Sequence, residues 1–294
     1  MSRGGRPRPR DRELGRVWMR DTYVNCFIVR GRPLYVATGT TRVPGLQAAA
    51  PWNDGIFVWT APSLRGPWRL VDTTRIRPGA EKGKVWSPEF VNENREGRTV
   101  VAPWQEYWSD ERFGKRGQVW APEVHCFRGK WYIVACMGDH SRKVGSFLLV
   151  SEGGIEGPYR LAEGNLDKPF GESFIGGPDF IEPGAYHHID GSTRHAYDPP
   201  GPGRTQYQYD AVVAVADRFE GPYSKRWTLG VGAGHNNLFR DHAGRLWATF
   251  FRNPNAGYWA DPSRTGDAAV PGVVRLEWTG PRGDRLYVQR RRGH

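Results

Sequence analysis

The chain has 294 residues and a formal net charge of +11, and it is rich in aromatic residues (13 Trp, 12 Tyr and 13 Phe). Its 38 Gly and 23 Pro residues indicate many turns, so the composition favours short strands over long helices. No apolar run approaches the roughly 18 residues of a membrane-spanning helix. The three cysteines have no metal-ligand spacing and do not suggest a disulfide framework.

Much of the positive charge lies at the two ends. Residues 1–16 hold six Arg against two acidic residues, and residues 282–294 hold five Arg against one. Such charge is typical of segments that bind nucleic acid or an anionic surface, but it is equally compatible with two solvated arms that bind nothing. The arms lack the interleaved aromatic residues of single-strand binders, so we favour solvated arms and expect no nucleic-acid partner. We therefore predict a disordered basic arm (1–16), one domain (17–281) and a basic tail (282–294).

The N-terminal residues contain no apolar run that would serve as a secretory signal. We therefore expect a cytoplasmic protein without a membrane partner.

Three segments have the pattern of a β-hairpin. In residues 27–37, two apolar runs flank Arg30-Gly31-Arg32-Pro33, which predicts a turn between two strands. Residues 127–135 repeat this pattern, and residues 238–251 repeat it with a longer turn.

A Gly-Pro-aromatic step occurs three times, at residues 66–68, 157–159 and 221–223. Each copy follows a short apolar run of the kind that forms a buried strand, and Gly-Pro predicts a turn before the next edge strand. Three copies in this context indicate repeated antiparallel sheets. No convincing amphipathic helix of three turns is present.

The step Trp120-Ala121-Pro122-Glu123 leads directly into one of the predicted hairpins. It places a carboxylate near the start of a strand, and residues 86–89 (Trp-Ser-Pro-Glu) echo it. Repeated four-stranded sheets close most naturally as a β-propeller, and blades of about 40–50 residues would allow five or six. An irregular β-sandwich is the alternative.

Several motifs in order along the chain resemble those of family 43 glycoside hydrolases, the five-bladed arabinanase and β-xylosidase type of propeller. They are Met19–Tyr23, Trp52–Gly55, Trp120–Glu123, Ile189–Ser192, the Gly-Pro-Tyr turns, and Gly234–Asn237 followed by Phe239–Asp241. The resemblance implies an all-β, five-bladed propeller. It also implies inverting hydrolysis of pentose or related glycosides, and we expect an exo-acting enzyme on glycans that contain arabinose, xylose or galactose.

The family uses three carboxylates, and the resemblance assigns them here. Asp21 matches the general base, Asp190 matches the carboxylate that tunes and orients the acid, and Glu182 resembles the general acid. Inversion requires the acid and base carboxyls to be about 6.5–9.5 Å apart, which leaves room for water. Each residue also has a structural interpretation: Asp21 as a cap at a strand start, Asp190 as part of an Asp-Gly turn, and Glu182 as a loop carboxylate.

The chain departs from the family order, because Glu182 precedes Asp190 and residues 193–208 contain no Glu. Either the third and fourth blades are truncated, or Glu182 is a displaced substitute for the acid. Loss of general-acid catalysis typically costs about 10²–10⁴ in rate. The alternative function is therefore a catalytically impaired propeller that binds glycans without hydrolysis.

Further residues are expected to contact an oligosaccharide or glycoside substrate: Trp52, Asp54, Trp120, Glu123, His235 and Arg252. For Trp52 and Asp54 the alternative is a buried turn, and for Arg252 it is contact with solvent. No cofactor is required. In the family a His at the position of His235 lies on the propeller axis and helps to hold a hydrated structural calcium; a core histidine is the alternative.

Overall fold

The computed structural model contains strands and connecting segments, and no helix occurs in the part of the chain that it describes. The described residues are 18–42, 55–79, 81–87, 90, 92–93, 99–100, 109–110, 115–116, 118–138, 146–151, 153–162, 186–187, 192–194, 210–216, 222–225, 227–230, 236–251, 271–281 and 285–289. The all-β prediction is confirmed for these ranges. They contain no helix long and apolar enough to cross a membrane.

Most of the strands belong to four four-stranded antiparallel sheets, each ordered as the chain runs. The first sheet comprises β1 (Trp18–Val29), β2 (Arg32–Arg42), β4 (Trp59–Ala61) and β5 (Arg69–Leu70). The second comprises β11 (Gln118–Phe127), β12 (Lys130–Gly138), β13 (Ser146–Ser151) and β14 (Arg160–Leu161). The third comprises β15 (Tyr186–His187), β16 (Ser192–Arg194), β17 (Asp210–Val213) and β18 (Trp227–Gly230). The fourth comprises β19 (Leu238–Arg240), β20 (Leu246–Phe251), β21 (Pro271–Thr279) and β22 (Arg285–Val288).

Three two-stranded sheets complete the set. They are β3 (Ile56–Phe57) with β6 (Lys84–Trp86), β7 (Asn92–Glu93) with β8 (Thr99–Val100), and β9 (Ser109–Asp110) with β10 (Lys115–Arg116).

The predicted hairpins form, and the backbone angles of two of their turns identify the turn type. In the β1–β2 turn, Arg30 and Gly31 have φ of 50° and 74°, and Val29 pairs with Arg32. The β11–β12 turn repeats this with Arg128 at 50° and Gly129 at 75°. Two consecutive positive φ values are those of the two-residue turn whose twist matches that of paired strands. The turn is therefore shorter than the four residues that the sequence predicted, because Arg32 and Pro33 already belong to β2.

The Gly-Pro-aromatic steps precede edge strands in the first two sheets. Gly66-Pro67 and Gly157-Pro158 are cis peptides, and the aromatic residues that follow, Trp68 and Tyr159, are buried. The edge strands β5 and β14 begin directly after them. The third copy differs: Tyr223 is exposed, and β18 begins only at Trp227.

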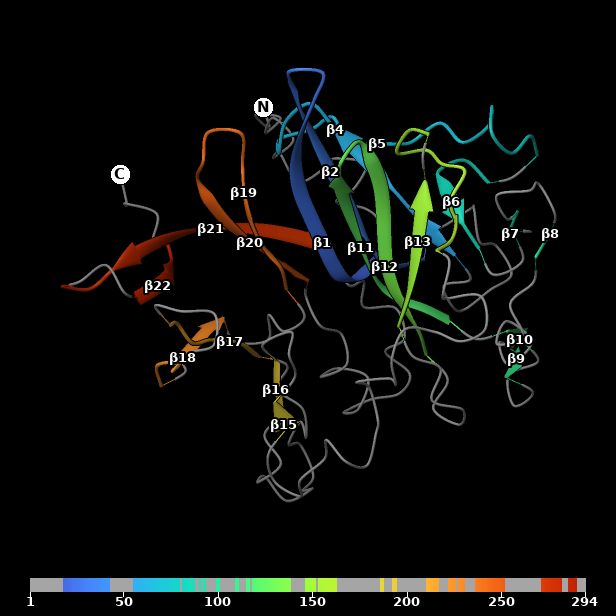
Figure 1. Cartoon of the computed structure of the whole chain (residues 1–294). Helices are drawn as coiled ribbons and strands as arrows, with labels where there is room; N and C mark the ends of the chain where they lie inside the picture. The colour runs from blue at the N-terminus through green and yellow to red at the C-terminus, as the bar shows by residue number, and fades with distance from the viewer. Residues whose placement is uncertain are drawn as a thin grey trace, which may run out of the picture.

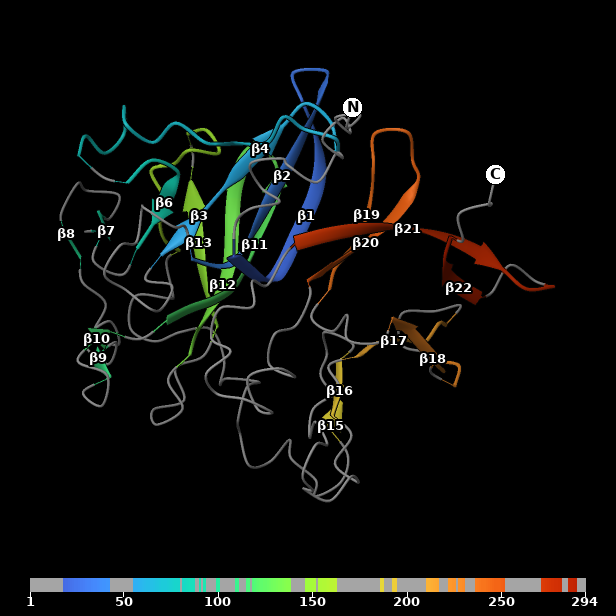
Figure 2. The ribbon, with the colours of Figure 1, turned by 180° about the vertical axis from the view of Figure 1, so that it is seen from behind.

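The first sheet lies between the second and the fourth, as both views show (Figures 1 and 2). Alternate residues of β1 take part in two different cores. Tyr23 packs with Val124 and Ile133 of the second sheet, whereas Val24 packs with Trp59 and with Phe239 of the fourth. This is the face-to-face stacking of sheets that a propeller requires.

The fourth sheet contacts the first through polar groups as well as apolar ones. The side chain of Asn237 accepts the N–H of Val24 at 3.1 Å and donates to its carbonyl oxygen at 2.9 Å. Nearby, Tyr35 Oη lies 2.6 Å from His242 Nδ1. The segments joined are 213 and 207 residues apart in sequence, so the first sheet along the chain contacts the fourth.

Contacts link the sheets in the order second, first, fourth, third. The ring is not closed between the second and third sheets in the ranges that the structure describes. The predicted five blades therefore stay a prediction. The sequence suggested truncated third and fourth blades around residues 193–208. Here the structure has one four-stranded sheet of short strands, in which β16 pairs directly with β17.

Candidate functional site

The inner strands of the first two sheets carry the same irregularity. In β1, Arg20 pairs with Thr40 and Tyr23 with Thr38, so β1 holds one extra residue. In β11, the register shifts in the same way between Trp120 and Glu123. A β-bulge of this kind bends the strand and re-aims a side chain, and bulges are frequent beside active sites.

Asp21 and Ala121 occupy equivalent places in the two bulges. Their φ angles are 52° and 49°, in the left-handed region that few residues other than glycine adopt. Asp is among the residues that tolerate this conformation best, whereas Ala has no side-chain hydrogen bond to offset its cost. At equivalent positions, the bulge of the first sheet thus carries a carboxylate (Asp21) and the bulge of the second sheet carries only a methyl group (Ala121).

One hydroxyl group connects the two bulges. Thr40 Oγ1 donates to Asp21 Oδ2 at 2.5 Å and accepts the backbone N–H of Ala121 at 2.8 Å. Thr40 itself is buried, and Asp21 is half-buried. The bond from Thr40 therefore uses Asp21 Oδ2 as an acceptor.

Glu123 lies at the far end of the second bulge, beside His125. Glu123 Oε2 and His125 Nε2 are 3.3 Å apart, and both side chains are about half exposed (46% and 45%). The ring of Tyr23 lies 5.7 Å from that of His125. A carboxylate, an imidazole and an aromatic ring from two neighbouring inner strands therefore lie together at one place.

The hydroxyl of Tyr23, whose ring contacts this cluster, is held in place by two hydrogen bonds. It donates to the carbonyl oxygen of Val124 at 2.9 Å and accepts from Asn25 Nδ2 at 2.9 Å. Burial raises the pKa of Tyr23 to about 12; the hydrogen bond from Asn25 opposes this rise and the charge of Glu123 adds to it. The phenol is therefore a structural donor and carries no charge near neutral pH.

Cys136 shows that the two carboxylates share one region. Its Sγ donates to the carbonyl oxygen of Trp120 at 3.5 Å. Burial, together with the negative charges of Asp21 and Glu123, raises the pKa of the Cys136 thiol to about 12. The thiol is thus neutral near pH 7, and the charges of both carboxylates act on it.

Asp241 lies away from this cluster, in the β19–β20 turn, and its role is structural. Its buried carboxylate accepts Arg245 Nε at 2.7 Å and Trp247 Nε1 at 2.9 Å, together with the N–H groups of Ala243 and Arg245. Burial alone would raise its pKa, but these four hydrogen bonds lower it below the ordinary range. All four hydrogen bonds come from the turn and from the strand that follows it.

The structure brings together three of the residues that the sequence nominated: Asp21, Trp120 and Glu123. The others, Glu182, Asp190, Trp52, Asp54, His235 and Arg252, lie outside the described residues. Their assignments, including the calcium at His235, stay predictions. Within the described ranges, no group of three or more His, Cys, Asp or Glu side chains is placed to hold a metal ion.

Sequence reasoning missed Thr40, His125 and Cys136. A signal for Thr40 was present in Thr38-Gly39-Thr40. A Cβ at Gly39 would lie 2.6 Å from the carbonyl oxygen of Arg20. A glycine between two threonines in a strand indicates a close approach of backbones, which here occurs at the bulge.

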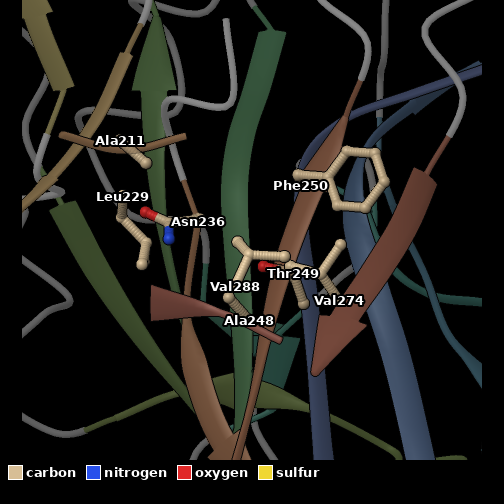
Figure 3. A pocket seen from close by; sticks show the side chains of 8 residues that line it. All are labelled: Ala211, Leu229, Asn236, Ala248, Thr249, Phe250, Val274 and Val288. Carbon is tan, nitrogen blue, oxygen red and sulfur yellow. The ribbon is translucent and has the colours of Figure 1, made fainter. Parts of the chain in front are cut away.

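A hollow of about 160 Å³ lies between the third and fourth sheets (Figure 3). Its walls include Ala211 and Leu229 from the third sheet and Ala248, Phe250 and Val274 from the fourth. Asn236 and Thr249 are the two polar residues that line it. Because most of the lining residues are apolar, we interpret the hollow as a packing gap between two sheets. A sugar site would need several convergent polar groups.

No model of a protein family matches the sequence, and no curated protein matches it. Solved structures do match. A thermostable family-43 glycoside hydrolase gives a TM-score of 0.52 at 15% identity, over 94% of each chain. An exo-1,5-alpha-L-arabinanase from a bovine ruminal metagenomic library gives a TM-score of 0.50 at 11% identity, over 94% of this chain and 97% of the other. The chain therefore has the fold of family 43 glycoside hydrolases, which its motifs resemble.

Proposed function

We propose that the protein is a glycoside hydrolase, exo-acting and inverting, on glycans that contain arabinose, xylose or galactose. The observation that carries this proposal is the carboxylate of Asp21 at the bulge of an inner strand, where it accepts a hydrogen bond from the Thr40 hydroxyl. The fold supports it, because one structure that matches is a family-43 glycoside hydrolase and another is an exo-arabinanase.

In the proposed reaction Asp21 takes a proton from water as the water oxygen bonds to the anomeric carbon. The bond from that carbon to the leaving oxygen breaks, and Glu182 gives its proton to this oxygen. The carboxyl of Asp190 orients Glu182 and raises its affinity for the proton. Attack opposite to the leaving group inverts the anomeric centre.

Glu123 and Trp120 are proposed to contact the sugar, since both flank the second bulge, which Thr40 links to Asp21, and neither is fully buried. His125 extends this surface, and its contact with Glu123 limits the orientations of that carboxylate. Trp52, Asp54, His235 and Arg252 complete the proposed substrate site. We propose no required cofactor; a calcium ion on the axis, held through water at His235, would be structural.

The test is hydrolysis of a panel of aryl arabinosides, xylosides and galactosides by the wild type and by Asp21→Asn. Loss of the base is expected to lower kcat/KM by about 10²–10⁴-fold. Asp72→Asn is the matched control, because Asp72 is an exposed aspartate that bonds to Thr74 in a turn beyond the first sheet. Proton NMR of the first product tests inversion. Equal, non-zero activity of wild type and Asp21→Asn would exclude Asp21 from the mechanism.

A second candidate function is glycan binding without hydrolysis. It is favoured by the third sheet, in which β16 pairs directly with β17, and the connection between them holds no Glu. The general acid then depends on Glu182 alone. Calorimetry that detects arabino- or xylo-oligosaccharide binding, with no turnover of the same sugars, would support this function over the first.

A further inference from the structure

We propose that Thr40 is a positioning residue for the base: it fixes Asp21 and ties this carboxylate to the second sheet. The inference rests on the proposed function, and it assigns to Thr40 a role that the sequence motifs do not include. Thr40 lies on β2, directly opposite Arg20 and one residue from the bulge.

The hydrogen-bond geometry assigns a direction to the contact. A hydroxyl has one proton, and the backbone N–H of Ala121 can only donate, so Thr40 Oγ1 accepts from Ala121 and is left to donate to Asp21 Oδ2. The base therefore has one oxygen occupied by a permanent donor.

The second sheet offers an internal comparison. Cys136 pairs with Trp120 just as Thr40 pairs with Arg20, so Cys136 is the counterpart of Thr40. Opposite Cys136 the bulge carries Ala121, which has no carboxylate, and the thiol donates to the Trp120 carbonyl instead. The two sheets share this backbone geometry, but the first has the Thr40 hydroxyl beside the carboxylate of Asp21. The second has the Cys136 thiol, and its bulge carries no carboxylate at the equivalent position.

Fixing the carboxylate matters because proton abstraction depends on its angle and distance to water. A side chain at a bulge is re-aimed by its backbone, but its own torsions still have to be restrained. The buried Thr40 supplies this restraint, and the Ala121 N–H in turn fixes the rotation of the hydroxyl. The position of the base is then set jointly by two sheets, through Thr40 and Ala121, which are 81 residues apart in sequence.

The experiment compares Thr40→Val, which keeps the shape and removes the hydroxyl, with Thr40→Ser, which keeps the hydroxyl. For the best substrate of the panel, Thr40→Val is expected to lower kcat by about 10- to 100-fold with KM within about threefold, as for loss of a hydrogen bond to a charged group. Thr40→Ser is expected to keep at least about a third of the activity. Thr38→Val is the matched control, because Thr38 is a buried hydroxyl on the same strand that donates to the carbonyl oxygen of Phe57. Its activity per folded molecule should equal that of the wild type.

A second readout separates this inference from the proposed function. Amide hydrogen exchange at Ala121 should be faster in Thr40→Val than in the wild type and unchanged in Thr38→Val, whether or not the protein hydrolyses glycosides. If the wild type shows no turnover but this exchange pattern holds, the hydrolase proposal fails and the link from Thr40 to the second sheet stands. Unchanged exchange at Ala121 in Thr40→Val, or equal loss of kcat in Thr40→Val and Thr38→Val, would overturn the role of Thr40.

Discussion

At the scale of single residues, the candidate site combines local backbone strain with specific hydrogen bonds that hold the strained positions. Asp21 and Ala121 both adopt left-handed φ, and a strained backbone position of this kind costs about 1–3 kcal/mol unless the surroundings enforce it. Two elements enforce it here: the bulge in each strand, and the Thr40 hydroxyl that bonds to both residues. The position of Asp21 is therefore imposed by groups from two sheets and does not follow from its own preference.

Tyr23 gives a prediction about alkaline stability. Its pKa is raised by burial to about 12 from 10.0, so the folded state favours the neutral phenol. The stabilisation is fully present below pH 10 and is lost as the pH rises through about 12. A shift of two units corresponds to about 3 kcal/mol.

Chemical denaturation between pH 9 and 12 tests this prediction. The wild type should lose more stability than Tyr23→Phe over this range, because both proteins share the titration of Cys136 and differ only in the phenol. Near pH 7, Tyr23→Phe should cost about 1–3 kcal/mol, because Val124 and Asn25 lose their partner. Parallel pH curves for the two proteins would contradict the buried, neutral phenol.

At the scale of elements, the side chain of Asn237 takes the place of a paired strand. It bonds to both the N–H and the carbonyl of Val24, and Thr249 Oγ1 donates to its Oδ1 at 2.9 Å. The amide precedes β19 and reaches β1, so a single residue joins the fourth sheet to the first. An isolated four-stranded sheet with two apolar faces needs such neighbours, because neither face is stable in water.

Replacing Asn237 by Ala should lower the free energy of unfolding by about 2–4 kcal/mol, because the buried backbone groups of Val24 lose both partners. Asn237→Asp should also destabilise, since it keeps an acceptor but loses the donor to the Val24 carbonyl. Asn236→Ala is the neighbouring control, as Asn236 has no hydrogen bond in the part of the chain that the structure describes. Equal midpoints of urea unfolding for the Asn236 and Asn237 variants would refute the role of Asn237.

At the scale of the whole molecule, local patterns in the sequence predicted the units of the fold but not their mutual contacts. The hairpins at residues 27–37 and 127–135 could be predicted because short apolar runs and an Arg-Gly turn are adjacent in the chain. The link from Thr40 to Ala121 could not, because it joins residues 81 positions apart through a bulge whose register is a property of paired strands. The same holds for Asn237 and Val24. Of the candidate site, the motifs predicted Asp21, Trp120 and Glu123, and the contacts added Thr40, His125 and Cys136.

The hollow between the third and fourth sheets gives a prediction about packing. Ala248 is buried and its methyl group lines the hollow (Figure 3). Ala248→Val would add two methyl groups to unfilled apolar space, and each buried carbon is worth about 0.8 kcal/mol before strain and loss of entropy. The variant should therefore be more stable by up to about 1 kcal/mol, seen as a higher Tm, with unchanged activity.

Ala37→Val is the matched control for this prediction. Ala37 is also a buried strand alanine, but it lies in the close-packed core between the first and fourth sheets, beside Trp59 and Phe239. The same two carbons there must displace neighbours, which typically costs about 1–3 kcal/mol. Opposite signs of the change in Tm are expected for the two variants, because one site has room and the other has none. If both variants are destabilised alike, the third and fourth sheets pack as closely as the first and fourth do, and the hollow is filled in solution.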